Sequence, residues 1–493
     1  MAALRKLAGQ TALYGVSSIV GRLLNYLLVP LHTRVFSTQE FGAITELYAY
    51  VAFLLVLLTY GMETAFFRFG GAAVSETERK QIFSTSFISI LCSTLLFWLL
   101  VFTQVQSIAE ALNYAQNPDY IVYFAAIVGL DVLSTVPFAR LRLLNKAFTF
   151  VMVNLGSIGL YIALNIFFLM YCPVAFEDES LPGHGWISSF YRSEFGIGYV
   201  FVANLISSGF KFALLTPWMK EIFFGFHRNL AARLYAYAWP LLLLSLAGII
   251  NEIFSRAYFV QLSPLAEEEA RAELGIFGAC YKVAMLLTIG IQAYRFAAEP
   301  YVFSLKSDES AKTQASVMKY FSIAASLLML ALLCFLDIAM LLVGEAMREG
   351  ASVVPILLLA YFCFGVVFNL SFWYKLNDKT IYGALIAIVG AALTIGLNVW
   401  LIPLYSYVGS AWATLLAYAS MMLLSYYLGQ KHHPISYPLR EISLYVGLAA
   451  ALYGLHYFLS LPEPFHYASG AVVVVSYVSI VMLRESKKIK PSS

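Results

Sequence analysis

The chain has 493 residues, of which 61% are hydrophobic and only 12% are charged, and its formal net charge is +3. Soluble domains are about 45–50% apolar and about 25% charged, so a soluble fold of this length would lack the charge to cover its surface. The composition excludes a soluble enzyme, a disordered protein and a nucleic-acid-binding protein, and it predicts a chain whose solvent is mostly lipid.

Long apolar runs follow one another along the whole chain, and a bilayer-spanning helix needs about 20 such residues. The first run begins after Arg5 and Lys6 and continues past Arg22 with no small-residue cleavage site, which predicts a retained helix rather than a signal peptide. We expect fourteen spanning helices, at residues 8–33, 41–67, 81–104, 117–139, 147–171, 196–219, 235–260, 275–301, 317–343, 350–373, 380–403, 407–429, 441–460 and 465–483.

Loops that are rich in basic residues alternate along the chain with loops that have few. Most of the 31 lysine and arginine residues, Lys211 among them, are assigned to one side, together with both termini. The loops of the other side contain only Arg34, Arg192, Arg271 and Arg348. Because cytoplasmic loops carry the excess of lysine and arginine, we expect both termini to be cytoplasmic.

An internal repeat connects the two halves of the chain. Its matches, each 233 positions apart, are Gly42 with Gly275, Tyr48 with Tyr281, Lys146 with Lys379 and Asn165 with Asn398. The constant offset predicts two six-helix lobes, 1–230 and 231–430, followed by two extra helices and a basic tail in 431–493. Six is an even number, so both lobes enter the membrane from the same side and are parallel. The predicted fold class is an all-α polytopic membrane protein.

Charged residues inside spanning helices are costly and are therefore candidates for function. We expect one polar cavity, because these residues concentrate in the first pair of helices of each lobe. The candidate substrate-binding residues are Arg22, Asn25, Arg256, Lys282 and Arg295. The candidates for ion coupling or charge pairing are Glu46, Glu63, Asp131, Glu252 and Glu299, with Asp337 as a further buried acid.

A structural role is the alternative for most of these residues. Glu252 with Arg256 and Arg295 with Glu299 are spaced i,i+4, so each pair is also expected to form an ion pair within its helix. Arg22 has no acidic residue nearby on its own helix, which favours a ligand or a partner on another helix.

A structural role is also open for the acids and the lysine close to helix ends. Glu46 and Lys282 are placed where their side chains can extend to the membrane surface. Glu63 is expected to pair with Arg68, and a kink at Pro137 is expected to turn Asp131 toward the cavity.

Arginine binds phosphate groups through a planar, permanently charged fork, so such a cavity suits a multiply charged anion. The acids suit proton or cation sites. No enzymatic motif appears, and the five cysteines lie in or beside apolar runs without metal-ligand spacing. We therefore expect no enzyme activity, no cofactor and no metal site, and transport driven by an ion gradient or by the substrate gradient.

Several segments together resemble the bacterial polysaccharide-transport proteins. These are the oligosaccharide flippases, of the O-antigen type, in the multidrug/oligosaccharidyl-lipid/polysaccharide exporter superfamily. The segments are Arg22–Pro30, Phe36–Gly42, Ile249–Arg256, Leu274–Lys282 and Ile291–Pro300. The resemblance extends over essentially the whole chain. It departs from the family at Ser255, where relatives commonly have an acid directly before the arginine.

The resemblance implies a flippase of the cell inner membrane with two lobes that alternate access. Its substrate would be an oligosaccharide on a polyprenyl pyrophosphate, moved from the cytoplasmic to the outer leaflet for surface polysaccharide biosynthesis. The basic cavity residues would hold the pyrophosphate and sugar, and the polyprenyl tail would stay in membrane lipid beside the last two helices. Proton or sodium coupling and a polysaccharide polymerase are implied partners.

Further functions remain open from the sequence. The same superfamily includes multidrug or small-cation antiporters and lipid II flippases. A membrane glycosyltransferase or polymerase usually needs catalytic loops longer than the longest one here, Pro173–Phe195. A major-facilitator transporter would carry a basic loop motif that is missing from residues 70–80.

Overall fold

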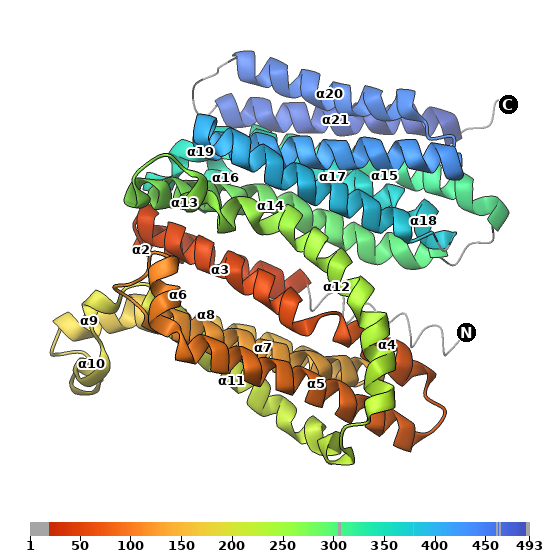
Figure 1. The fold of residues 1–493 in the computed structure, drawn as a ribbon. Coiled ribbons are helices and arrows are strands. Elements are labelled where there is room, and N and C mark those ends of the chain that lie inside the picture. The colour runs from red at the N-terminus through yellow and green to blue at the C-terminus, as the bar shows by residue number, and fades with distance from the viewer. Residues whose placement is uncertain (1–18, 304–306, 378, 460–461, 463–464, 490–493) are drawn as a thin grey trace. The chain divides into compact units, whose positions relative to one another are not determined.

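The computed structural model of the chain describes residues 19–303, 307–377, 379–459, 462 and 465–489. These residues are mostly helical and contain no strand (Figure 1). They divide into two compact units, Met1–Tyr258 and Phe259–Ser493. The predicted all-α membrane fold is confirmed.

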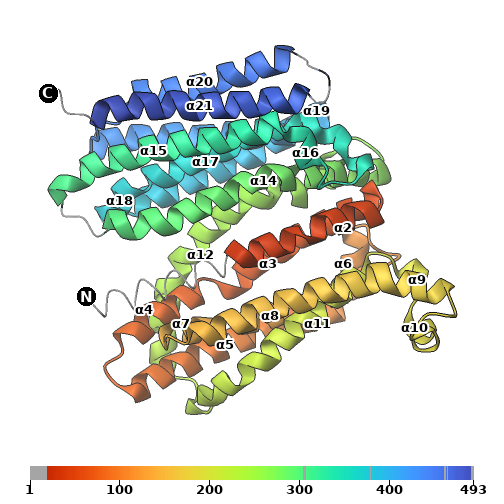
Figure 2. The same ribbon diagram turned by 180° about the vertical axis from the view of Figure 1, so that it is seen from behind.

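The first unit consists of long helices with short ones at their ends. α8 and α11 lie side by side, and α9 and α10 project beyond the end of α8 (Figures 1 and 2). A π-helical turn, Phe167–Tyr171, joins α8 to α9, and a 3₁₀ segment, Thr216–Phe224, follows α11. The helices are α2 Leu28–Val35, α3 Thr38–Thr59, α4 Met62–Ala72, α5 Glu76–Thr103, α6 Val105–Ala111, α7 Asp119–Leu143, α8 Ala147–Ile166, α9 Cys172–Glu177, α10 His184–Phe190, α11 Gly198–Leu215 and α12 Arg228–Ala257.

The second unit packs α17 against α19 and α14, with α15 beside them. A 3₁₀ segment, Glu345–Val353, precedes α17. Its helices are α13 Phe259–Leu262, α14 Glu267–Phe303, α15 Ser307–Cys334, α16 Leu336–Met340, α17 Val354–Leu370, α18 Phe372–Leu376, α19 Ile381–His432, α20 Leu439–Leu459 and α21 Phe465–Ile489.

Twelve helical segments of the described residues are long and apolar enough to cross a membrane. The predicted number of fourteen is therefore not reproduced one for one. The predicted first helix, 8–33, lies partly outside the described residues. The predicted helices 380–403 and 407–429 together form the single segment α19.

Within α19 the chain reverses direction at Ser406, whose backbone has φ 51° and ψ −136°. In a straight helix, residues eight apart are separated by about 12 Å. A Cβ atom on Gly409 would nevertheless lie only 2.3 Å from the carbonyl oxygen of Leu401. The reversal falls between the two predicted helices, so the sequence placed this turn correctly.

The predicted helix 41–67 is interrupted in the structure. Ser37 and Glu40 form a reciprocal capping box that starts α3. α3 ends at Thr59, and both Tyr60 and Gly61 have left-handed backbone conformations, with φ of 35° and 74°. A side chain on Gly61 would meet α12, since its Cβ would lie 3.1 Å from the carbonyl oxygen of Ala238. The break therefore lets the chain pass close to α12 before α4 begins.

The internal repeat appears as repeated local hydrogen bonding. Lys146 N donates to Leu141 O at 2.8 Å, and Lys379 N donates to Tyr374 O at 2.8 Å. Two fully buried asparagines at the same offset behave alike, because the Nδ2 of Asn165 donates to Tyr161 O and that of Asn398 donates to Thr394 O. These two pairs of positions thus have the same local hydrogen bonding, as a duplication would give.

Helix α12 packs with the first unit, against α3 and α4. Ala49, Ile253 and Ala257 form a small buried cluster between α3 and α12. The predicted lobe boundaries at residues 230 and 430 follow the sequence repeat, whereas the division at Tyr258 follows packing contacts. The lobe boundaries stay predictions.

The last two helices, α20 and α21, pack on each other and on α15 (Figures 1 and 2). Lys319 of α15 forms an ion pair with Glu485 of α21 at 2.6 Å, and Tyr445 of α20 donates to the same carboxylate at 2.6 Å. An apolar cluster that includes Tyr477 completes the contact. Three helices are thereby joined around one buried carboxylate.

Candidate functional site

Arg22 and Asn25 lie on the helical turns that precede α2, and both side chains are exposed. Neither has a hydrogen bond or ion pair with any residue that the structure describes. An arginine within a predicted membrane helix is stable only with a partner, such as water, a lipid headgroup or a ligand. The ligand of Arg22 stays a prediction.

Glu46 is fully buried within the first unit, which contradicts the alternative that it extends to the membrane surface. The hydroxyl of Tyr50 donates to its Oε1 at 3.0 Å, and that of Tyr114 donates to its Oε2 at 2.9 Å. Tyr50 also approaches Ala257 O, at the end of α12, at 2.7 Å. Because a hydroxyl has one proton, Tyr50 divides its donation between the carboxylate and the last turn of α12.

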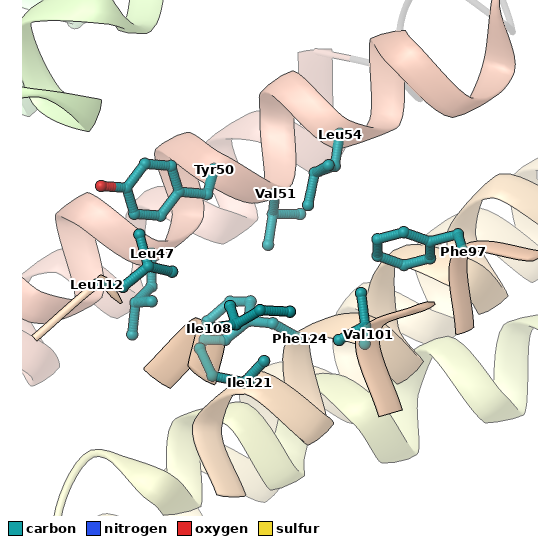
Figure 3. Close-up of a pocket in the computed structure, with 11 residues that line it drawn as sticks. Leu47, Tyr50, Val51, Leu54, Phe97, Val101, Ile108, Leu112, Ile121 and Phe124 are labelled. Atoms are coloured by element: carbon teal, nitrogen blue, oxygen red, sulfur yellow. The ribbon is translucent and has the colours of Figure 1, made fainter. Parts of the chain in front are cut away.

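An apolar pocket lies next to this carboxylate, between α3, α5, α6 and α7, and its space, including the part open to solvent, is about 430 Å³. Figure 3 shows Leu47 and Val51 of α3 facing Ile121 and Phe124 of α7 across it. Tyr50 belongs both to the pocket wall and to the Glu46 network. The pocket suits a hydrocarbon group, and its wall contacts the polar network through one residue.

Two further acids of the first unit pair with cations from other helices. Glu63 pairs with Arg142. The predicted partner, Arg68, instead lies over the ring of Tyr237, at 4.4 Å from its centroid. The prediction for Glu63 was wrong because the side chain of Arg142 comes from α7, which packs on α4.

Asp131 accepts a hydrogen bond from Lys211 Nζ at 2.6 Å, and both side chains are about four-fifths buried. The assignment of Lys211 to the basic side of the membrane is wrong, because this residue lies within α11 and faces α7. The sequence carried a usable signal, because Lys211 stands well inside the predicted helix 196–219. It belongs with the charges inside helices.

On α12, Arg256 Nη2 donates to the backbone carbonyl oxygen of Glu252 at 2.9 Å. Glu252 is exposed and Arg256 is half-buried. The i,i+4 spacing thus brings the two residues together, with the backbone of Glu252 as the acceptor of this bond.

In the second unit, two cations lie over the aromatic ring of Phe368, a residue of α17. The guanidinium of Arg295 lies 4.2 Å from the centroid of Phe368, and Lys375 Nζ lies 4.9 Å from it. Lys375 pairs with Glu299 at 3.1 Å, so the predicted Arg295–Glu299 pair is wrong. The physical reason is that α18 brings a lysine to Glu299 while the aromatic face stabilises Arg295. Lys282 is half-buried on α14.

Asp337 is not inside a spanning helix, contrary to the prediction. α15 ends at Cys334, and Asp337 lies on the short helix α16 with its side chain 71% exposed. Its carboxylate is 3.8 Å from His466 Nε2. This position removes the desolvation cost that made it a candidate.

The candidates thus separate into two sets. The first unit contains Arg22, Asn25, Glu46, Glu63, Asp131, Glu252 and Arg256. The second contains Lys282, Arg295 and Glu299. A single cavity shared by both sets stays a prediction. Among the described residues, no group of three or more histidine, cysteine, aspartate or glutamate side chains could hold a metal ion.

No family model and no curated protein matches the sequence. Solved structures do match it. An inward-facing multidrug resistance MATE family transporter of the MOP superfamily shares 12% identity at a TM-score of 0.63, over 84% of this chain and 94% of the other. The lipid II flippase MurJ, in an inward closed conformation, shares 13% at a TM-score of 0.64, over 96% of this chain and 99% of the other.

This chain has the fold of these two solved membrane proteins. A third structure, that of the MATE multidrug transporter DinF-BH, also has it, with 15% identity and a TM-score of 0.55 over 87% of this chain and 96% of the other.

Proposed function

We propose that this MOP-fold protein is a flippase that moves a polyprenyl-pyrophosphate-linked oligosaccharide from the cytoplasmic to the outer leaflet by alternating access. The product would serve surface polysaccharide biosynthesis. The observation that carries the proposal is a set of cations on long apolar helices, where charge is costly. These cations are Arg22, Arg256, Lys282 and Arg295. A pyrophosphate is the kind of multiply charged anion that arginine binds.

Arg22 and Asn25 are the best-supported substrate contacts, because both side chains are exposed and free to meet a ligand. Among the acids, Glu46 is the stronger candidate for proton or sodium coupling. Its carboxylate is fully buried and accepts hydrogen bonds from two tyrosine hydroxyls. Glu63, Asp131 and Glu299 each pair with a cation. Those three favour a charge-pairing role, and Glu252 stays a candidate for either role.

We also propose a cellular location and an orientation for this protein. The protein would span the inner membrane with both termini cytoplasmic, as the distribution of basic loops predicts. It would act beside the polymerase that extends the exported oligosaccharide. Accessible cysteines introduced at the N-terminus and in the loop 178–183 would test this orientation by labelling from opposite sides.

Replacing Arg22 or Arg256 with alanine is expected to lower surface glycan by about ten-fold or more, since a hydrogen bond to a charged group contributes about 1.5–3 kcal/mol. Immunoblots of surface polysaccharide from complemented cells measure the effect. The control is Arg192→Ala, which removes an exposed arginine outside the predicted helices. Wild-type export by both cavity variants, at equal protein level, contradicts the assigned roles.

Two alternatives have specific support. The MurJ match, which covers nearly the whole of both chains, favours a lipid II flippase. The MATE matches favour an ion-coupled multidrug or small-cation antiporter. Rescue of a lipid II flippase mutant would identify the first. Drug resistance on expression, without a glycan phenotype, would identify the second.

A further inference from the structure

A small polar pocket lies at one end of the first unit, where α4, α5 and α7 meet. The space between its lining side chains, including the part open to solvent, is about 240 Å³. It contains none of the residues proposed above for transport. The side chains that matter for its chemistry are Phe66, Glu76, Arg79, Lys80, Phe83 and Arg140.

Arg140 is held rigidly at the pocket. Both of its terminal nitrogens bind the carboxylate of Glu221, and one also donates to the carbonyl oxygen of Trp218. Its guanidinium lies 4.7 Å from the ring centroid of Phe83. Because these contacts come from both α5 and the 3₁₀ segment Thr216–Phe224, they fix the position of the Arg140 charge in the wall.

The two remaining cations are more accessible. Arg79 Nη1 binds Glu76 at 2.9 Å, with both side chains partly exposed. Lys80 Nζ lies 5.5 Å from the ring centroid of Phe224, and no carboxylate within the described part of the chain forms an ion pair with it. The hydroxyl of Ser84 anchors the Phe224 segment to α5 by binding the carbonyl oxygens of Ile222 and Gly225, both at 2.8 Å.

The pocket therefore has an excess of positive charge over an apolar floor. Its described lining contains three cations and one carboxylate, and Glu221 balances Arg140 from behind. Lys80 supplies the remaining charge. Phe66 and Phe83 are fully buried beneath these groups. Such a site suits an anion attached to an apolar body better than a fully hydrated one.

The pocket lies at the ends of two helices, and this position indicates which kind of molecule supplies the anion. α5 begins at Glu76 and α7 ends at Leu143, and both are membrane-crossing segments. The ends of membrane-crossing helices meet the lipid headgroups, where basic clusters attract anionic lipids. We propose that this pocket binds the phosphate of an anionic membrane lipid headgroup.

Lys80 then contacts the phosphate directly, and Arg79 shares its fork between Glu76 and the lipid. This assignment goes beyond the proposed flippase function and does not depend on it, because it concerns a resident lipid rather than the transported substrate.

The test uses the full-length protein in detergent and short-chain dihexanoyl phosphatidylglycerol, with native mass spectrometry to count bound lipid. Lys80→Ala is expected to weaken binding about five-fold, the effect of one basic residue near a headgroup. Glu76→Gln is expected to strengthen it, because one negative charge leaves the lining. Lys146→Ala is the matched control, since it removes an exposed lysine of the same unit outside the pocket.

Three outcomes would overturn the assignment. Equal loss in Lys80→Ala and Lys146→Ala would show a general effect of surface charge. Equal binding of dihexanoyl phosphatidylcholine would show that the anionic headgroup is not recognised. Displacement of the lipid by equimolar inorganic phosphate would show a site for free phosphate. Thermal unfolding without lipid checks that Lys80→Ala leaves the fold intact.

Discussion

Replacing Arg140 with alanine is expected to lower the free energy of unfolding by about 3–5 kcal/mol, the cost of removing one partner from a buried ion pair. The side chains of Arg140 and Glu221 are only 12% and 19% exposed. The substitution leaves a largely buried carboxylate without its two-pronged partner. It also removes the donor to Trp218 O and the cation over Phe83. Thermal and denaturant unfolding of the purified protein in detergent measures the loss.

The matched control is Arg79→Ala, which removes an arginine whose ion pair with Glu76 is partly exposed, with side chains 35% and 59% accessible. An exposed pair contributes about 0–1 kcal/mol, so this variant should unfold close to wild type. The double variant Arg140→Met, Glu221→Leu should recover most of the stability, because no charge is then left buried. Equal stabilities of Arg140→Ala and Arg79→Ala would contradict the interpretation of a buried pair.

Replacing Gly409 with alanine is expected to destabilise the second unit by about 3 kcal/mol or more, at the upper end of the range for overpacking. The new Cβ would lie 2.3 Å from the carbonyl oxygen of Leu401. A backbone atom cannot rotate aside as a side chain can, so the reversal at Ser406 would have to open. Lower yield of folded protein, or an earlier unfolding transition, would show this effect.

Gly396→Ala is the control for Gly409→Ala, because Gly396 lies in α19 and no atom lies within 4 Å of a Cβ built there. Alanine also favours a helix over glycine by about 1 kcal/mol. Gly396→Ala should therefore be as stable as wild type or slightly more stable. If Gly409→Ala behaved like Gly396→Ala, the tight approach of Leu401 would be refuted.

The charged residues within apolar helices were predictable from the sequence, but their ion-pair partners were not. The cost of charge in an apolar segment drew attention to Asp131, Glu63 and Glu299, and each does lie in or beside a membrane-crossing helix. Their partners were not predictable from i,i+4 spacing. Lys211, Arg142 and Lys375 come from other helices, and only packing brings them within reach.

The tyrosine partners of Glu46 were likewise not predictable from the sequence. Nothing in the sequence connects Glu46 with Tyr114, which is 68 residues away in the chain. A lone tyrosine in an apolar chain carries no signal of its own, and the apolar pocket beside it is formed by four helices. Pockets depend on how side chains from separate helices fit together, and composition alone does not specify that fit.

By itself, the sequence determined that the chain is an all-α membrane protein, since apolar length alone decides what can span a bilayer. It also placed the turn near Ser406. It predicted an internal repeat, and Lys379 and Asn398 do keep the local hydrogen bonds of their counterparts 233 positions earlier. Only the tertiary structure decided the break at Tyr60 and Gly61, the ion-pair partners and the burial of Glu46. Local signals fix helices because helical hydrogen bonds connect near neighbours. Charge partners are fixed by contacts between helices, which a linear pattern does not encode.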